Sequence, residues 1–189
     1  MRDDNKGYSI VELIIVIAIM AIITGFLAYS FSMVTGQQPR ECANNISVAL
    51  DKAKIYSMSK SGSSDAYVEI WLDSNKGYVA SYYAPNSPIK VNAIPGTDYI
   101  KIEEEIIGKK TVSVECFLAD ASGTSFEING TNRIRIYYDR ITGGFKKAAA
   151  VLGGSTMEEY CAKIAVSRGR EYQITFITAT GKHSLERIH

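Results

Sequence analysis

An uninterrupted apolar run near the N-terminus constrains this 189-residue chain more than any other feature. No charged side chain occurs from Leu13 to Val34, and Glu12 is the only charged residue between Gly7 and Arg40. At about 1.5 Å per residue, an α-helix over this run spans roughly 33 Å, enough to cross the ~30 Å hydrocarbon core of a bilayer. Because lipid offers backbone groups no partners, we expect a transmembrane helix here.

Glu12 is the acidic group at the start of this run. A carboxylate near the bilayer centre costs about 2.5–3.5 kcal/mol on insertion scales, whereas one near a helix end can reach the interface. Glu12 is therefore either a tolerated interfacial acid or the partner of a cation. If the chain is cut after Gly7, the new α-amine of Tyr8 is largely charged at neutral pH and lies one helical turn from Glu12. The amine of the same chain or of a neighbouring chain would then pair with Glu12, and pairing with a neighbour would set the register of an assembly.

The segment Gly7-Tyr8-Ser9-Ile10-Val11-Glu12-Leu13, with the apolar residues that follow it to Ile19, resembles the class III signal of type IV prepilins and type II secretion pseudopilins. That signal has a short polar leader ending in Gly, then Phe-Thr-Leu-Ile-Glu-Leu and an apolar helix. Two departures occur here. Tyr8 replaces the usual Phe, and the leader over residues 1–6 holds two acids besides two bases.

The resemblance implies a course of processing and assembly. A prepilin peptidase would cut between Gly7 and Tyr8 and methylate the new Tyr8 amine. The chain would then be a single-pass protein of the cytoplasmic (inner) membrane with its head outside the cytoplasm. From there it would join other pilin or pseudopilin subunits in a fibre, helix against helix, with Glu12 taking part in assembly.

Two other interpretations of the N-terminus exist. An ordinary secretory signal has an apolar core of about 7–15 residues and a small-x-small cleavage site, for which Ala28-Tyr29-Ser30 would serve. The longer run and the acid within it disfavour this reading. A plain single-pass anchor is the other, and it does not require a Gly-aromatic junction.

Helical spacing continues beyond the apolar run. Apolar residues recur three or four apart at Ile46, Leu50, Ala53 and Tyr56. Pro39 predicts a kink or short break near residues 36–39, and Gly62 is a suitable helix stop. We therefore predict a leader over residues 1–7, a long helix over 8–61 that is transmembrane to about residue 34, and a globular β-rich head over 62–189.

A period of two begins after Asp65 and predicts strands. Their expected ranges are 66–72, 78–83, 99–102, 111–118, 125–128, 133–138, 145–152 and 172–178. The turn sequence over residues 129–132 predicts that 125–128 and 133–138 form a hairpin. A capping box over 155–158 favours a short helix, in competition with a strand over 161–167. The three glutamates at 103–105 are expected in a solvated loop.

The predicted fold class is α+β, with the long helix packed on an antiparallel, β-sandwich-like head. The stretches 53–62 and 174–182 also resemble the H-type minor pseudopilins of type II secretion and related minor pilins. This second resemblance implies a sandwich-like head rather than the small sheet of major pilins.

The cysteines are sparse, so this is not a disulfide-framework protein. Cys42, Cys116 and Cys161 permit at most one intramolecular bridge. Cys116 and Cys161 both occur in strand-like runs and form the candidate pair. Three reduced thiols agree with the sequence equally well.

An enzymatic, metal or cofactor role finds no support in the sequence. The two histidines, His183 and His189, are expected in the C-terminal tail, and no phosphate-binding Gly loop is present. The formal net charge is only +1, so no global field attracts nucleic acid. The main prediction is a structural subunit, a prepilin-like precursor of a type IV pilus or of a type II secretion or competence pseudopilus.

One local basic patch gives an alternative function. Its residues are Arg133, Arg135, Arg140, Lys146 and Lys147. On the outer face of a strand they would bind phosphates, as in a minor pilin that takes up DNA. Otherwise they are the charges of an exposed strand face that deter edge pairing.

Overall fold

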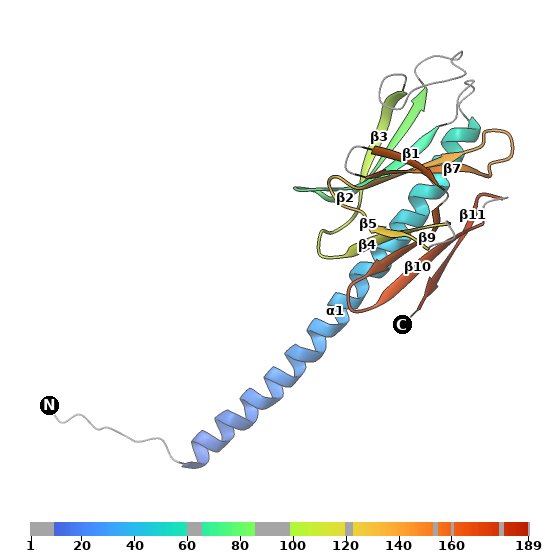
Figure 1. The fold of residues 1–189 in the computed structure, drawn as a ribbon. Coiled ribbons are helices and arrows are strands. Elements are labelled where there is room, and N and C mark those ends of the chain that lie inside the picture. The colour runs from blue at the N-terminus through green and yellow to red at the C-terminus, as the bar shows by residue number, and fades with distance from the viewer. Residues whose placement is uncertain are drawn as a thin grey trace.

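The computed structural model describes residues 10–59, 66–85, 99–119, 123–152, 155–159, 161–177 and 180–188. These ranges contain one helix and eleven strands: α1 (Ile10–Ser59), β1 (Tyr67–Asp73), β2 (Gly77–Pro85), β3 (Tyr99–Gly108), β4 (Ser113–Leu118), β5 (Ser125–Glu127), β6 (Arg133–Tyr138), β7 (Phe145–Leu152), β8 (Ser155–Glu159), β9 (Cys161–Ser167), β10 (Glu171–Ile177) and β11 (Lys182–Arg187). Figure 1 shows that the β-rich head packs against only the C-terminal half of α1.

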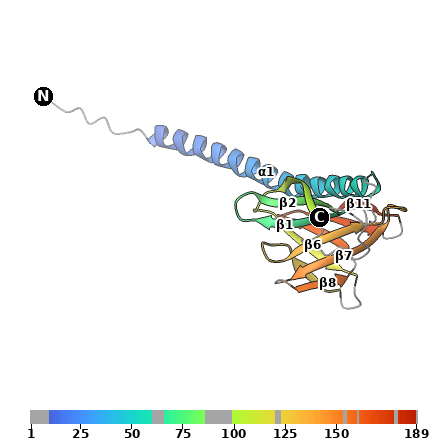
Figure 2. The same cartoon turned by 90° about the horizontal axis from the view of Figure 1, so that it is seen from above.

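The long helix is continuous and includes Pro39. Of the kink or short break predicted near residues 36–39, no break occurs, but the axis does change direction where α1 meets the head (Figures 1 and 2). Proline removes one backbone hydrogen bond and crowds the preceding turn, which bends a helix without ending it when its flanks are held. Here the following flank is held by packing, because Ile46, Leu50 and Ala53 are all buried.

The strands form two antiparallel sheets. The first has the order β3-β2-β1-β6-β7-β8 and the second the order β11-β10-β9-β4-β5. Buried side chains of both sheets and of α1 make one core, for example Ile70, Ile164 and Leu50. The helix contacts β3 of the first sheet and β9, β10 and β11 of the second, so it lies along one side of the head (Figure 2). The α+β class with a sandwich-like head is thus confirmed.

The predicted hairpin between β5 and β6 is wrong. β5 pairs with β4 in the second sheet, and β6 pairs with β1 and β7 in the first. The turn between them does form, because Asn129 Oδ1 accepts from the backbone N of Thr131 at 2.9 Å and of Asn132 at 2.6 Å. The turn carries the chain from one sheet to the other. A turn that connects two sheets has the same local chemistry as a turn within a hairpin.

Residues 155–159 also differ from the prediction, since they form strand β8 and not a short helix. β8 is the edge strand of the first sheet and pairs with β7 along its whole length. This ladder hydrogen-bonds alternate residues of β8 to β7, which gives the backbone of the segment partners that a strand requires.

Strand β3 extends beyond the predicted 99–102 and includes the three glutamates, so the solvated loop is a further error. Glu103 accepts from Lys52 Nζ and from the Tyr56 hydroxyl, both at 2.7 Å. Lys76 Nζ donates to Glu104 at 2.6 Å. These bonds tie β3 to α1 and to the turn between β1 and β2, which explains why a carboxylate run is compatible with a strand here.

Candidate functional site: the exposed half of the helix

The N-terminal segment Ile10–Leu27 of α1 is apolar, and the described part of the head does not bury it. Ile10–Leu27 has a mean hydropathy of 2.8, and none of it is buried within the molecule. The side chains are exposed all around the helix, for example Ile10 at 78% and Phe26 at 72%. A helix that is apolar on every side is stable inside a membrane or among other helices, and not in water. The length and composition of this segment suit a membrane span.

The two polar side chains near this span are placed as a membrane helix requires. Thr24 Oγ1 donates to the carbonyls of Met20 and Ala21, so its hydroxyl is satisfied within the helix. Glu12 lies in the first turn, where the positive end of the helix dipole favours an acid. It is therefore at the end of the span and not at its centre. Gly7 and Tyr8 lie outside the described residues, so the cleavage junction stays a prediction.

One comparison with known proteins bears on this segment. The model of the prokaryotic N-terminal methylation motif matches residues 2–28. The match includes the Gly7–Tyr8 junction, Glu12 and most of the apolar run. The chain carries a type IV prepilin-like or pseudopilin signal. This confirms the N-terminal resemblance found in the sequence and supports membrane anchoring through α1. No curated protein and no solved structure matches the chain.

Two residues of the predicted basic patch are engaged by the head itself. Arg135 Nε donates to Glu69 Oε1 at 3.1 Å, and Arg133 Nη1 lies 4.0 Å from the same oxygen. The Arg133 guanidinium also covers the Trp71 ring, 4.7 Å from its centroid. Burial by itself would lower the pKa of Arg135, but the Glu69 carboxylate, together with Tyr67 and Tyr137, outweighs this effect and raises the pKa. These arginines face outward as predicted, yet their charge is already shared with a buried acid.

Sequence reasoning missed Glu69, which has 3% exposure on the outer face of β1. No sequence signal marked this partner, because Glu69 lies opposite Arg135 only through the β1–β6 pairing, which the fold creates. Of the other patch residues, Arg140 and Lys146 are exposed, and the side chain of Lys147 lies outside the described part.

The candidate cysteine pair lies in contact. Cys116 on β4 and Cys161 on the neighbouring β9 are both buried free thiols, with their Sγ atoms 2.8 Å apart. Burial, and then the neighbouring thiol, raises the pKa of Cys161 well above its usual range. The structure therefore brings together the two cysteines that the strand pattern selected.

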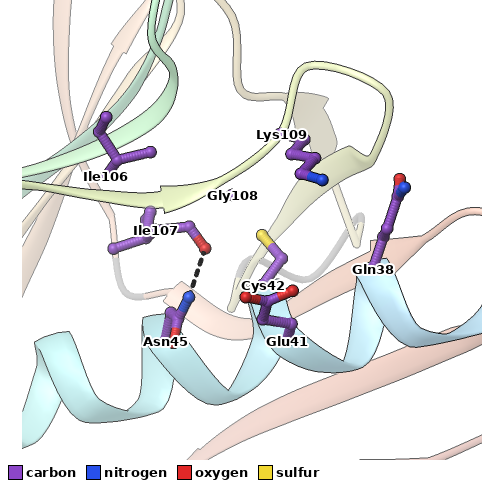
Figure 3. A pocket seen from close by; sticks show the side chains of 8 residues that line it. All are labelled: Gln38, Glu41, Cys42, Asn45, Ile106, Ile107, Gly108 and Lys109. Carbon is purple, nitrogen blue, oxygen red and sulfur yellow. Dashed lines mark hydrogen bonds between the residues drawn. The ribbon is translucent and has the colours of Figure 1, made fainter.

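Cys42 lies apart from this pair, in a small pocket between α1 and β3 (Figure 3). The pocket has a volume of about 140 Å³ and is lined by Gln38, Glu41, Cys42, Asn45, Ile106, Ile107, Gly108 and Lys109. Asn45 Nδ2 donates to the Ile107 carbonyl at 3.1 Å. A Cβ added at Gly108 would lie 2.4 Å from Cys42 Sγ, so only glycine permits this approach.

The Cys42 thiol is not suited to reaction. Burial, and then the Glu41 charge, raises its pKa to about 12, so it stays protonated at neutral pH. The pocket is a gap between two packed elements.

His183 lies on β11, not in a tail as predicted, and packs against α1. Its Nε2 is 2.5 Å from Ser47 Oγ, and burial lowers its pKa. Within the described ranges its buried Nδ1 has no hydrogen-bond partner, so Ser47 and His183 lack the third group that orients a catalytic histidine. The same part of the chain holds no group of three His, Cys, Asp or Glu side chains that fits a metal.

Proposed function

We propose that this chain is the precursor of a structural subunit of a type IV pilus or of a type II secretion or competence pseudopilus. In this proposal a prepilin peptidase cuts between Gly7 and Tyr8 and methylates the Tyr8 amine. The head then stands outside the cytoplasmic membrane, and the apolar half of α1 leaves the bilayer to pack against the helices of other subunits. The chain acts by assembly and not by catalysis.

A single observation carries this proposal: a methylation motif that includes an apolar helical segment, Ile10–Leu27, which the described part of the head leaves uncovered. A helix with this surface needs lipid before assembly and other helices after it. The head supports the same conclusion, because the second half of α1 is built into its core and joins head and span rigidly.

The cleavage step is tested with Gly7→Val, which should leave the precursor uncut when the peptidase is present. Gly25→Ala is the matched control, because a Cβ added at Gly25 meets nothing within 4 Å. Intact-mass analysis should show a wild-type chain and a Gly25→Ala chain that begin at a methylated Tyr8. Cleavage after Ser30, or equal cleavage of Gly7→Val, would contradict the proposal.

The assembly step is tested with Glu12→Gln, which keeps the shape of the side chain and removes its charge. If Glu12 pairs with the Tyr8 amine of a neighbour, the variant leaves that amine unpaired, at a cost of roughly 3–5 kcal/mol for a buried pair. Membrane levels should hold or rise, because the insertion cost of the carboxylate is gone. Crosslinks between subunits near residues 8 and 12 should disappear.

The control for this step is Glu41→Gln, which removes an exposed carboxylate from the same helix outside the span. It should assemble normally. Normal assembly of Glu12→Gln would show that Glu12 is only an interfacial acid, and the pairing would have to be abandoned.

A further inference from the structure

Four arginines lie at the end of the head that is nearest the apolar half of α1. Arg40 is on α1, Arg168 and Arg170 flank the turn between β9 and β10, and Arg187 ends β11. We call this set the arginine cluster. The Arg170 side chain lies directly against the helix, because a Cβ added at Gly36 would be 2.9 Å from its Cζ. The cluster therefore begins where the helix enters the head.

Three members of the cluster share one open pocket. Its volume is about 390 Å³, and its lining residues are Arg40, Asn44, Arg170, Tyr172, Leu185, Glu186 and Arg187. Three guanidinium groups against the single carboxylate of Glu186 leave a formal charge of +2. All three arginines are exposed, and the described residues supply none of them with an ion pair. This differs from Arg135, whose charge is met by Glu69.

Arg168 extends the positive surface toward the turn after β3, where it contacts Gln38 and Thr111. Its Nη1 donates to Gln38 Oε1 and, at 2.8 Å, to Thr111 Oγ1. Both acceptors are uncharged, so they hold the guanidinium in place without neutralising it.

The height of the cluster along α1 matches the lipid headgroups. The apolar run ends at Val34, so Gly36 lies about 3 Å and Arg40 about 9 Å further along the helix axis. The headgroup layer on each side of the hydrocarbon core is roughly 5–7 Å thick. The Arg170 guanidinium, at the level of Gly36, is therefore at the depth of the lipid phosphates, and the pocket opens just beyond it.

We propose that the arginine cluster binds the phosphate group of an anionic phospholipid in the membrane that α1 spans. A guanidinium group can form two parallel hydrogen bonds to two oxygens of one phosphate. Each basic residue near an anionic membrane surface raises the affinity for that surface about fivefold. Lipid bound there holds the base of the head on the bilayer until the subunit leaves it. This inference rests on the membrane span of the proposed function and not on cleavage or fibre assembly.

The test uses the full chain in detergent micelles, titrated with phosphatidylglycerol or phosphatidylcholine and followed by native mass spectrometry. The wild-type chain should bind the anionic lipid at least about fivefold more tightly, and added salt should weaken that binding. The variant Arg40→Gln/Arg170→Gln/Arg187→Gln should lose about 125-fold of this affinity, about fivefold for each of the three arginines. Glu186→Gln should gain affinity, since it removes the carboxylate that competes with the lipid.

The matched control is Arg140→Gln/Lys146→Gln/Lys182→Gln, which removes the same charge from exposed positions outside the cluster. It should bind lipid like the wild type, and so should Gly7→Val and Glu12→Gln. Equal affinity for the two lipids, or equal losses in the two triple variants, would overturn the proposal. Displacement by millimolar inorganic phosphate would overturn it as well, by showing a site for free anions.

Two results with the triple variant have a specific interpretation. If the triple variant fails to fold by circular dichroism, Arg187→Gln and Glu186→Gln decide, and wild-type affinity in both would refute the proposal. If the triple variant keeps its lipid affinity but loses crosslinks between subunits, the cluster binds an acidic protein surface, and the lipid assignment is wrong.

Discussion

Removing the Arg135 guanidinium should strongly destabilise the head, because it leaves the buried carboxylate of Glu69 without its nearest cation. The side chains of Glu69 and Arg135 are 4% and 19% exposed. Breaking a buried ion pair from one side typically costs about 3–5 kcal/mol. Arg133 Nη1 remains 4.0 Å from Glu69 Oε1 and compensates in part. We therefore expect Arg135→Met to lower the free energy of unfolding by about 3 kcal/mol, the low end of that range.

Two companion variants separate the charge from the packing. In Glu69→Gln/Arg135→Met both charges are absent, so no buried ion is left unpaired, and the loss should fall to about 1 kcal/mol. Arg140→Met removes an exposed arginine that follows the same strand, and it should change stability by no more than about 0.5 kcal/mol.

The assay is urea unfolding of the full chain in detergent, followed by the fluorescence of Trp71, the only tryptophan. Trp71 is a local probe, because the Arg133 guanidinium lies over its ring. With a slope of about 2–3 kcal/mol per molar urea, Arg135→Met should shift the midpoint by about 1–1.5 M. A shift below about 0.3 M, or a double variant as unstable as the single one, would refute the reasoning and leave Arg135 free to bind phosphates.

Two further predictions concern the thiols and the acidic strand. Because the Cys116 and Cys161 thiols are both buried, the bridge should form when the unfolded chain is refolded with oxidised glutathione. It should join Cys116 to Cys161, remove the mass of two hydrogens and stabilise the head by roughly 4 kcal/mol on the chain-entropy estimate for this loop. Cys42→Ser should form the same bridge, and a bridge that includes Cys42 would contradict the contact. Lys101 and then Lys76 lower the pKa of Glu104 to about 2. Because this pKa is depressed in the folded state, the stabilisation is complete above the unfolded value of about 4.3 and is lost as pH falls toward 2. Glu104→Gln should therefore flatten the loss of stability over that pH range, with Glu41→Gln as control, and an unchanged acid profile would count against the ion pairs.

The alternation of side chains along a strand explains why some of the head was predictable. Alternation along 133–138 correctly placed Ile134 and Ile136 inward and Arg135 outward, because side chains in a strand must alternate between faces. The helical spacing of Ile46 and Leu50 likewise identified the face of α1 that enters the core. Such periodicities are local, so they can be identified without knowing which element packs against the strand or helix.

The pairing of strands was not predictable in the same way. The turn at Asn129 has the chemistry of a hairpin, yet β5 and β6 belong to different sheets. Whether the two flanking strands pair depends on which sheet each strand can join. The residues of the turn do not determine this. The short helix predicted at 155–158 failed for the same reason, since the free edge of β7 that pairs with β8 is created only by the fold.

The sequence by itself determined the functional segment: the junction at Gly7, the acid at Glu12 and an apolar run long enough to cross a bilayer. These features depend only on residue type and spacing along one helix, so they can be recognised without the fold. Only the tertiary structure decided which charges are available to partners. It pairs Arg135 with a buried Glu69, and it gathers Arg40, Arg170 and Arg187, up to 147 positions apart in the chain, around one open pocket. Electrostatic availability depends on the nearest neighbours in space, and folding sets those neighbours.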